Sequence, residues 1–165
     1  MSLLAFAGAL VYLFRFTREV LGGDRVAQTA TWLLATYPFA LWYGVPYTES
    51  LFLLEAVGAF YHFRRDEYAK AGAWGLLVGL TRPNGCFLSI PLAVMAVAPW
   101  FPGWLRGGPP AESPDSPVSG GHRPAAALAH RLAAAALPGV GVLLYSAYVW
   151  QLTGNPLSWA EGHVA

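Results

Sequence analysis

Residues 132–150 read LAAAALPGVGVLLYSAYVW, a run of 19 residues without a charged side chain. An α-helix needs about 20 apolar residues to cross a hydrocarbon core of about 30 Å, so this run is long enough to span a membrane. Residues 26–43 and 86–104 form two further uncharged blocks of similar length. Helices that are apolar on every side must be buried all round, and a chain of 165 residues has too little interior for several of them. The sequence therefore predicts a protein embedded in a membrane.

The overall composition agrees with this prediction and excludes several classes of function. The chain is 56% hydrophobic and only 12% charged, whereas soluble domains carry about 25% charged residues. Its net charge of +1 provides no basic surface for nucleic acid. Cys86 is the single cysteine, and the four histidines show no metal-ligand spacing. Motifs for phosphate loops, dinucleotides and nucleophilic serines are also absent, so the sequence predicts no metal and no cofactor.

The apolar segments predict an all-α fold, a polytopic bundle of about six transmembrane helices. The predicted spans are residues 1–14, 26–43, 47–63, 69–80, 86–104 and 132–150. The fourth has 12 residues and a length of about 18 Å, which also fits a re-entrant or broken helix. Residues 105–124 are rich in glycine, proline and serine and predict a flexible cytoplasmic loop. We treat residues 1–165 as a single integral membrane domain.

The positive charges orient the predicted spans. If the six segments alternate across the membrane, nine of the ten cationic residues lie at one face and Arg82 alone lies at the other. The positive-inside rule makes the first face cytoplasmic. This asymmetry supports the short fourth segment as a crossing. It also places the connectors around Glu49 and Arg82 together at the extracytoplasmic face.

Three ionisable residues near that face are candidates for function, and each has a structural alternative. Glu49 could orient or deprotonate a hydroxyl, or it could only begin a helix behind the N-cap residue Thr48. Arg82 suits a phosphate because its planar guanidinium makes bidentate bonds; alternatively it faces lipid headgroups or pairs with Glu49. Glu55 lies deeper in the span, where a carboxyl group is either functional or hydrogen-bonded within the bundle.

Several short motifs resemble one enzyme family. The motifs are YPFA at residues 37–40, PYTESLF at 46–52, LTRPNG at 80–85 and GNPL at 154–157, with residues 13–23 upstream. Together they resemble the PIG-V type mannosyltransferases, which comprise the GPI mannosyltransferase 2 family and its bacterial relatives. That family has Tyr-Ser-Glu-Ser-Leu-Phe followed by Thr-Arg-Ser-Asn-Gly. Thr48 and Pro83 therefore each replace a serine of the family pattern.

The resemblance implies a GT-C type membrane glycosyltransferase that takes a sugar from a polyprenyl-phosphate donor at the extracytoplasmic face. It transfers a substrate-binding role to six positions. These are Tyr47, Glu49, Ser50, Arg82, Asn84 and Gly85. The family places an acidic residue in its first outer loop, after the first helix. This chain starts beyond that point, so we expect it to be a fragment whose catalytic base lies upstream, and we assign no catalytic residue.

The sequence thus predicts a mannosyltransferase-like enzyme whose partners are a lipid-linked sugar donor and membrane lipids. The alternatives are a polytopic transporter or lipid flippase, in which Glu55 and Arg82 line a pathway, and a noncatalytic membrane subunit. Nine arginines against one lysine, with abundant alanine and glycine, favour a bacterial cytoplasmic membrane over the endoplasmic reticulum membrane.

Overall fold

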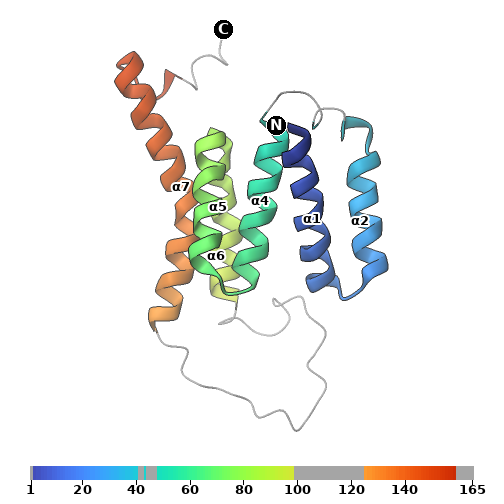
Figure 1. Ribbon diagram of the computed structural model, residues 1–165. Helices are drawn as coiled ribbons and strands as arrows, with labels where there is room; N and C mark the ends of the chain where they lie inside the picture. The colour runs from blue at the N-terminus through green and yellow to red at the C-terminus, as the bar shows by residue number, and fades with distance from the viewer. Residues whose placement is uncertain (1, 41–42, 44–47, 99–124, 159–165) are drawn as a thin grey trace.

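Helices alternate with short turns throughout the part of the chain that the structure describes, which comprises residues 2–40, 43, 48–98 and 125–158 of a computed structural model (Figure 1). In order, its elements are α1 (Ser2–Leu21), α2 (Asp24–Thr36), η1 (Pro38–Ala40), α4 (Glu49–Arg64), α5 (Tyr68–Thr81), η2 (Pro83–Leu88), α6 (Ser89–Val97) and α7 (Ala125–Thr153). The described residues form no strand, so the predicted all-α class is confirmed.

Helix α1 continues well past the predicted boundary at Phe14. It includes Arg15 and Arg18 and ends at Leu21; the next residue, Gly22, has a φ of 71°, the left-handed conformation that glycine adopts without strain. The Gly22 N–H bonds the Arg18 carbonyl oxygen at 3.1 Å, which closes the last turn. The positive charges do not stop the helix because long arginine side chains can extend toward water from its final turns.

Helix α2 ends at Thr36, so the prediction of one span over residues 26–43 is wrong in extent. Tyr37 has φ −58° and ψ 136°, outside the helical region. The following Pro38 causes this change, because its ring disfavours the helical conformation in the preceding residue. The chain then forms the short 3-10 helix η1.

The fourth predicted segment forms a helix close to its predicted bounds, whereas the fifth differs from expectation. Helix α5 is a continuous α-helix of 14 residues, which excludes the broken-helix alternative. The prediction for residues 86–104 is too simple, because the chain first forms the 3-10 helix η2 from Pro83 and then only nine residues of α6. Pro83 favours this start, since proline suits the first turn of a helix. Residues 99–104 and the predicted flexible loop at 105–124 lie outside the described residues.

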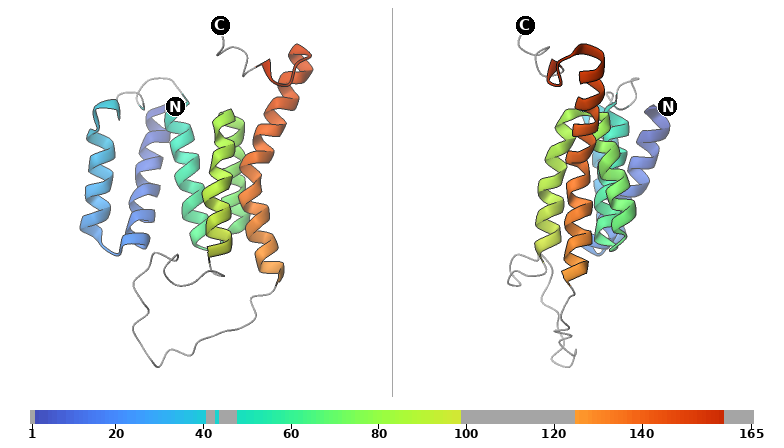
Figure 2. Two further views of the ribbon diagram at one scale, coloured as in Figure 1. Left: turned by 180° about the vertical axis from the view of Figure 1, so that it is seen from behind. Right: turned by 90° about the vertical axis from the view of Figure 1, so that its left-hand side faces the viewer.

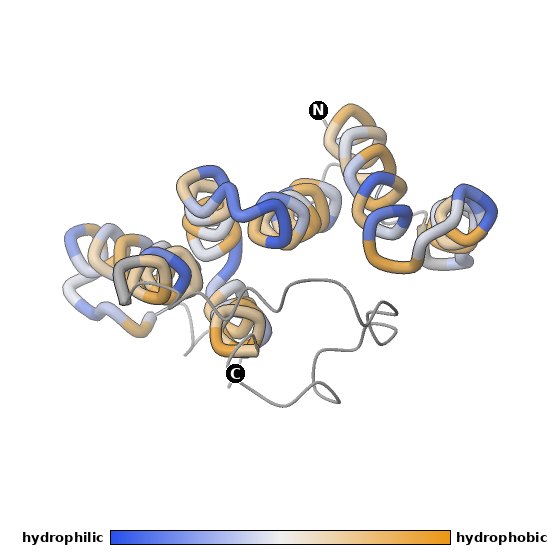
Figure 3. Tube along the Cα trace, turned by 90° about the horizontal axis from the view of Figure 1, so that it is seen from below, coloured by the Kyte–Doolittle hydropathy of each residue, from blue (hydrophilic) through white to orange (hydrophobic). Residues whose placement is uncertain are grey.

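Successive helices run in opposite directions, as the sequence predicted. Figures 1 and 2 show that α1 begins, and α7 ends, at the same end of the bundle. We call the end that carries the α1–α2 turn, the α4–α5 turn and the start of α7 the basic end. The opposite end, where α4 starts and α5 stops, is the Arg82 end. Viewed from the basic end, the α4–α5 turn is strongly hydrophilic (Figure 3).

Helices α5 and α7 pack with their backbones in close contact. A Cβ atom on Gly79 of α5 would overlap the Pro138 carbonyl oxygen, and one on Gly141 of α7 would overlap the Leu76 carbonyl oxygen. Only glycine fits these positions. On the other side of α5, the bundle continues through α4 and α1 to α2, which lies at the edge (Figures 1 and 3).

Helix α7 is the part of the described structure that best matches a membrane span. Its residues 127–153 form the one described helix that is long and apolar enough to cross a bilayer, and 22% of its apolar window is buried in the bundle. It projects beyond α5 at the Arg82 end (Figure 1). Large apolar side chains are exposed elsewhere too, including Trp32 at 68% and Leu33 at 66% on α2. Six spans stay a prediction.

Candidate functional site

Arg82 makes the central polar contacts at the Arg82 end. It follows the last residue of α5 in an extended conformation, with φ −148° and ψ 140°. Its Nε atom donates a hydrogen bond to Thr48 Oγ1 at 2.9 Å, and its Nη2 atom forms an ion pair with Glu49 Oε1. The Arg82 side chain is 36% exposed and that of Glu49 is 30% exposed. The pairing alternative that the sequence left open for Arg82 is therefore present.

The start of α4 differs in one respect from the sequence prediction. Glu49 does begin the helix, and Thr48 does occupy the N-cap position. The Thr48 hydroxyl, however, makes no capping bond to the backbone. It accepts from the Arg82 guanidinium, because a charged donor makes a stronger hydrogen bond than a neutral backbone N–H. The N-cap position of Thr48 is thus as predicted, but its hydroxyl helps to hold Arg82 instead of capping the helix.

One oxygen of the Glu49 carboxylate, Oε2, is buried and lacks a hydrogen-bond partner within the described residues. A buried oxygen of this kind carries a desolvation cost that a donor group would relieve. Because this atom has no exposed surface, a ligand hydroxyl reaches it only after the residues that cover it move.

Asn84 and Gly85 lie on η2, directly after Arg82. The Gly85 N–H donates to the Arg82 carbonyl oxygen at 2.9 Å, which tightens the turn. Gly85 is buried, and a Cβ atom there would overlap the Val78 carbonyl oxygen of α5. The close approach of α5 therefore explains why this position is a glycine. Asn84 is exposed, and it lies two residues after Arg82 in the chain.

The remaining predicted site residues do not join this cluster. Ser50 is fully buried, and its Oγ atom has no hydrogen-bond partner in the described part of the chain. Tyr47 lies outside the described residues. The structure thus brings Glu49 and Arg82 together, adds Thr48 to them, and places Asn84 nearby.

Glu55 is hydrogen-bonded inside the bundle, as one of the two sequence alternatives proposed. It is 3% exposed, and its Oε2 atom accepts a hydrogen bond of 2.8 Å from Thr81 Oγ1. Thr81 immediately precedes Arg82. The bond therefore ties the middle of α4 to the end of α5 that presents the guanidinium.

A second feature of the Arg82 end is an open, mainly apolar cavity on the surface with a volume of about 490 Å³. It lies between the first turns of α1 and the end of α2. Its lining comprises Leu3, Phe6, Ala35, Thr36, Tyr37, Pro38 and Ala40. Part of this lining belongs to the YPFA motif, for which the sequence alone suggested no position.

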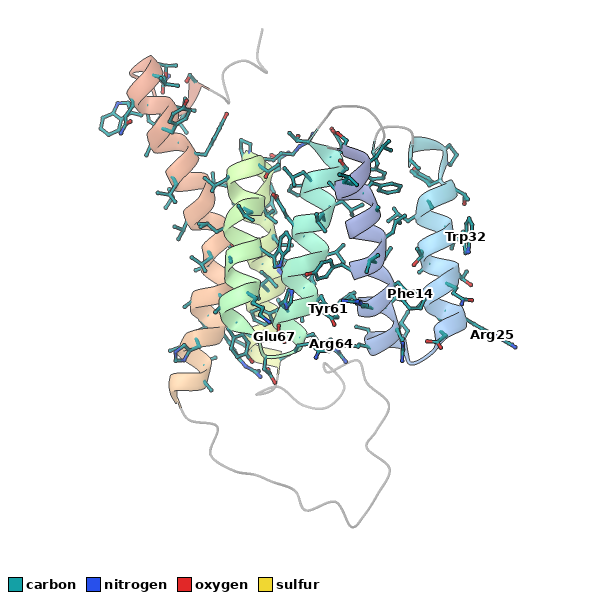
Figure 4. The ribbon with its side chains drawn as sticks, in the orientation of Figure 1. Phe14, Arg25, Trp32, Tyr61, Arg64 and Glu67 are labelled. Atoms are coloured by element: carbon teal, nitrogen blue, oxygen red, sulfur yellow. The ribbon has the colours of Figure 1, made fainter. Side chains whose placement is uncertain are left out.

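A polar network near the basic end was not predicted from the sequence. His62, the most buried histidine of those described at 9% exposed, lies between Tyr12 of α1 and Glu67 of the α4–α5 turn. Its Nδ1 atom is 2.6 Å from Glu67 Oε2, and its Nε2 atom is 3.2 Å from the Tyr12 hydroxyl. Lys70 also donates to Glu67, and these partners lower the pKa of the Glu67 carboxyl to about 2, with Lys70 the larger cause and His62 the next. Figure 4 shows Glu67 at the basic end, below Tyr61.

One sequence signal could have indicated this network. His62 follows Glu55 by seven residues, which is two helical turns, so both polar residues share one face of α4. The remaining partner, Tyr12, is 50 residues away from His62 in sequence, and only the packing of α1 on α4 brings it close.

No group of three or more metal-ligating side chains converges within the described residues. Comparison with known proteins adds no assignment to this geometry: no protein-family model, curated protein or solved structure matches the chain.

Proposed function

We propose that this protein is a membrane-embedded glycosyltransferase of the mannosyltransferase type, which transfers a sugar from a polyprenyl-phosphate donor at its Arg82 end. Arg82 binds the donor phosphate. Glu49, with Tyr47, positions the sugar or the acceptor hydroxyl, and Asn84 lies beside the phosphate. The observation that carries the proposal is the contact of Arg82 with Thr48 and Glu49.

The chemistry of this contact supports an anionic ligand with hydroxyl groups. The guanidinium is the one cationic side chain at this end among the described residues, and it remains about one-third exposed. Arginine forms charge-assisted bonds with phosphate oxygens. Glu49 lies beside it with a side chain that is 30% exposed, and a carboxylate accepts hydrogen bonds from hydroxyl groups. A sugar linked to a phosphate has both features that these two residues recognise.

The proposal includes a polytopic arrangement of six spans, with the Arg82 end outside the cytoplasm. Helix lengths of 14 residues in α5 and 20 in α1 correspond to about 21 and 30 Å, comparable with the hydrocarbon thickness once tilt and thinning are allowed. The exposed apolar side chains of α2 and α7 would then contact lipid. The cavity beside α1 would take part of the isoprenoid chain.

The test is sugar transfer by the full protein from a polyprenyl-phosphate mannose, measured in detergent for three variants. Arg82→Ala should lower turnover by about 100-fold or more, since removal of one charge-stabilising group costs this much in enzymes. Arg82→Lys keeps the charge and should retain part of the activity. Arg18→Ala removes an arginine that is ion-paired with Asp24 at the basic end, and it should leave transfer unchanged. Normal turnover by Arg82→Ala would refute the proposed role.

A transporter or lipid flippase is the second candidate, because a specific observation favours it. Glu55 is a nearly fully buried carboxyl group in the middle of α4, and intramembrane carboxyl groups often lie on ion or substrate pathways. Lipid translocation across vesicles of the purified protein separates the two functions. Glu55→Gln should abolish translocation by a flippase, whereas a transferase should retain most of its sugar transfer, since glutamine can still accept the Thr81 bond.

A further inference from the structure

Three arginines near the basic end have no ion-pair partner within the described residues. They are Arg15 of α1, Arg25 in the first turn of α2, and Arg64 at the end of α4, and all three are exposed. The other four described cations at this end each have an acidic partner. These pairs are Arg18–Asp24, Arg65–Glu19, Lys70–Glu67 and Arg131–Asp66.

The pairing leaves positive charge without an internal counter-charge. The described part of this end contains seven cationic and four acidic side chains, a net charge of +3. Each of the four acids already contacts a cation. No described carboxylate is therefore left for Arg15, Arg25 or Arg64, and the excess charge faces outward from the bundle.

Two of the three arginines, Arg15 and Arg25, border exposed apolar surface. Val26 follows Arg25 directly and is 45% exposed, and Val11, one helical turn before Arg15, is 51% exposed. Arg15 lies six residues before the end of α1, which is about 9 Å along the helix. Its long side chain can extend over this distance toward the basic end. In Figure 4 the Arg25 side chain points away from the bundle, and Arg64 lies at the same end.

We propose that Arg15, Arg25 and Arg64 bind the phosphate groups of anionic phospholipids in the leaflet at the basic end. A phosphate headgroup supplies the missing negative charge, and its acyl chains cover the neighbouring apolar surface. This combination selects a lipid over a free phosphate ion. The proposal rests on the membrane embedding proposed above but not on sugar transfer.

The test measures lipid retention by the full chain in a neutral detergent, using native mass spectrometry with equal amounts of phosphatidylglycerol and phosphatidylcholine. The wild type should retain phosphatidylglycerol preferentially. The triple variant R15Q/R25Q/R64Q should bind it about 100-fold more weakly, because each arginine near an anionic surface contributes about 1 kcal/mol, or about fivefold. The variant R15K/R25K/R64K keeps the charges and should keep most of the preference.

Matched controls separate direct contact from general charge. Lys70→Gln removes one positive charge at the same end from a residue that already has a partner, and it should weaken retention less than Arg64→Gln. Equal loss in both variants, equal retention of both lipids by the wild type, or displacement of the lipid by an equal concentration of inorganic phosphate would each overturn the proposal. Circular dichroism checks the fold of the triple variant. If that variant loses helix, the single variants Arg25→Gln and Arg64→Gln should still show about fivefold losses, and their absence would also refute it.

The lipid-binding proposal and the enzyme proposal can fail independently, and separate variants test them. Arg82→Ala should leave phosphatidylglycerol retention unchanged, since Arg82 lies at the opposite end. The triple arginine variant tests the lipid contact alone, whatever reaction the protein catalyses.

Discussion

Thr81 donates a hydrogen bond of 2.8 Å to the buried Glu55 carboxyl group, and the next residue in the chain is Arg82. The guanidinium that pairs with the first residue of α4 is thus anchored, through its neighbour, to the middle of the same helix. Two contacts on α4 set the position of the end of α5. The arrangement makes the polar interior of the bundle part of the support for the candidate site.

Thr81→Val should destabilise the protein by about 1–3 kcal/mol, because it leaves the buried Glu55 carboxyl without its donor. The double variant Thr81→Val/Glu55→Leu should recover part of this loss, since both polar partners are then replaced by apolar groups. Thermal unfolding in detergent measures both effects. Additive destabilisation in the double variant would show that the two side chains are not energetically coupled.

Glu49→Gln should lower the unfolding free energy by about 1 kcal/mol or less, because the Arg82 pair is partly exposed to solvent. The matched control is Asp24→Asn, which removes a pair whose side chains are 62% and 66% exposed. That control should have a smaller effect. A larger loss for Asp24→Asn would contradict the structural difference between the two pairs.

Gly141→Ala should destabilise the bundle by about 1–3 kcal/mol or more, because the added methyl group overlaps the backbone of α5. Gly139→Ala is its control on the same helix, two residues earlier. There the nearest atom to the new Cβ is the Ser89 hydroxyl at 3.8 Å, an ordinary contact. Alanine at Gly139 should be neutral or stabilising, since it favours the helix by up to about 1 kcal/mol. Thermal midpoints of the two variants compare them directly.

The Glu67 network predicts a pH dependence of stability. The pKa of Glu67 is about 2 in the folded chain, against an ordinary value of 4.5. Its stabilisation is fully present above pH 4.5 and is lost as the pH falls toward 2, because the unfolded chain takes up the proton first. The wild type should therefore lose more stability than Glu67→Gln between pH 4.5 and 2. Parallel pH curves for the two proteins would show that Glu67 contributes nothing in this range.

The direction of the helices could be predicted from the sequence, but several of their lengths could not. Charged and glycine-containing connectors indicate the α1–α2 and α4–α5 turns, and these turns place Glu49 and Arg82 at one end. The early end of α2 was missed although Pro38 signals it, because the apolar run continues through Phe39 and Ala40. The prediction followed the hydrophobicity of the run, whereas the restriction that Pro38 places on the preceding backbone ends the helix.

The candidate site was predictable in part for similar reasons. Glu49 and Arg82 stand out in sequence because charges are rare in an apolar chain. The role of Gly85 could not be inferred, since it depends on the approach of Val78 from another turn. The Tyr12–His62 contact joins residues 50 positions apart, and no local pattern encodes it.

The glycine contacts between α5 and α7 have a mechanical consequence. Where two backbones touch, no side chain lies between them that could rotate and let one helix slide past the other. Helices α5 and α7 should therefore move together as one rigid unit. Since Arg82 is joined directly to the end of α5, a tilt of the projecting part of α7 would carry the guanidinium with it and stretch its contacts with Thr48 and Glu49.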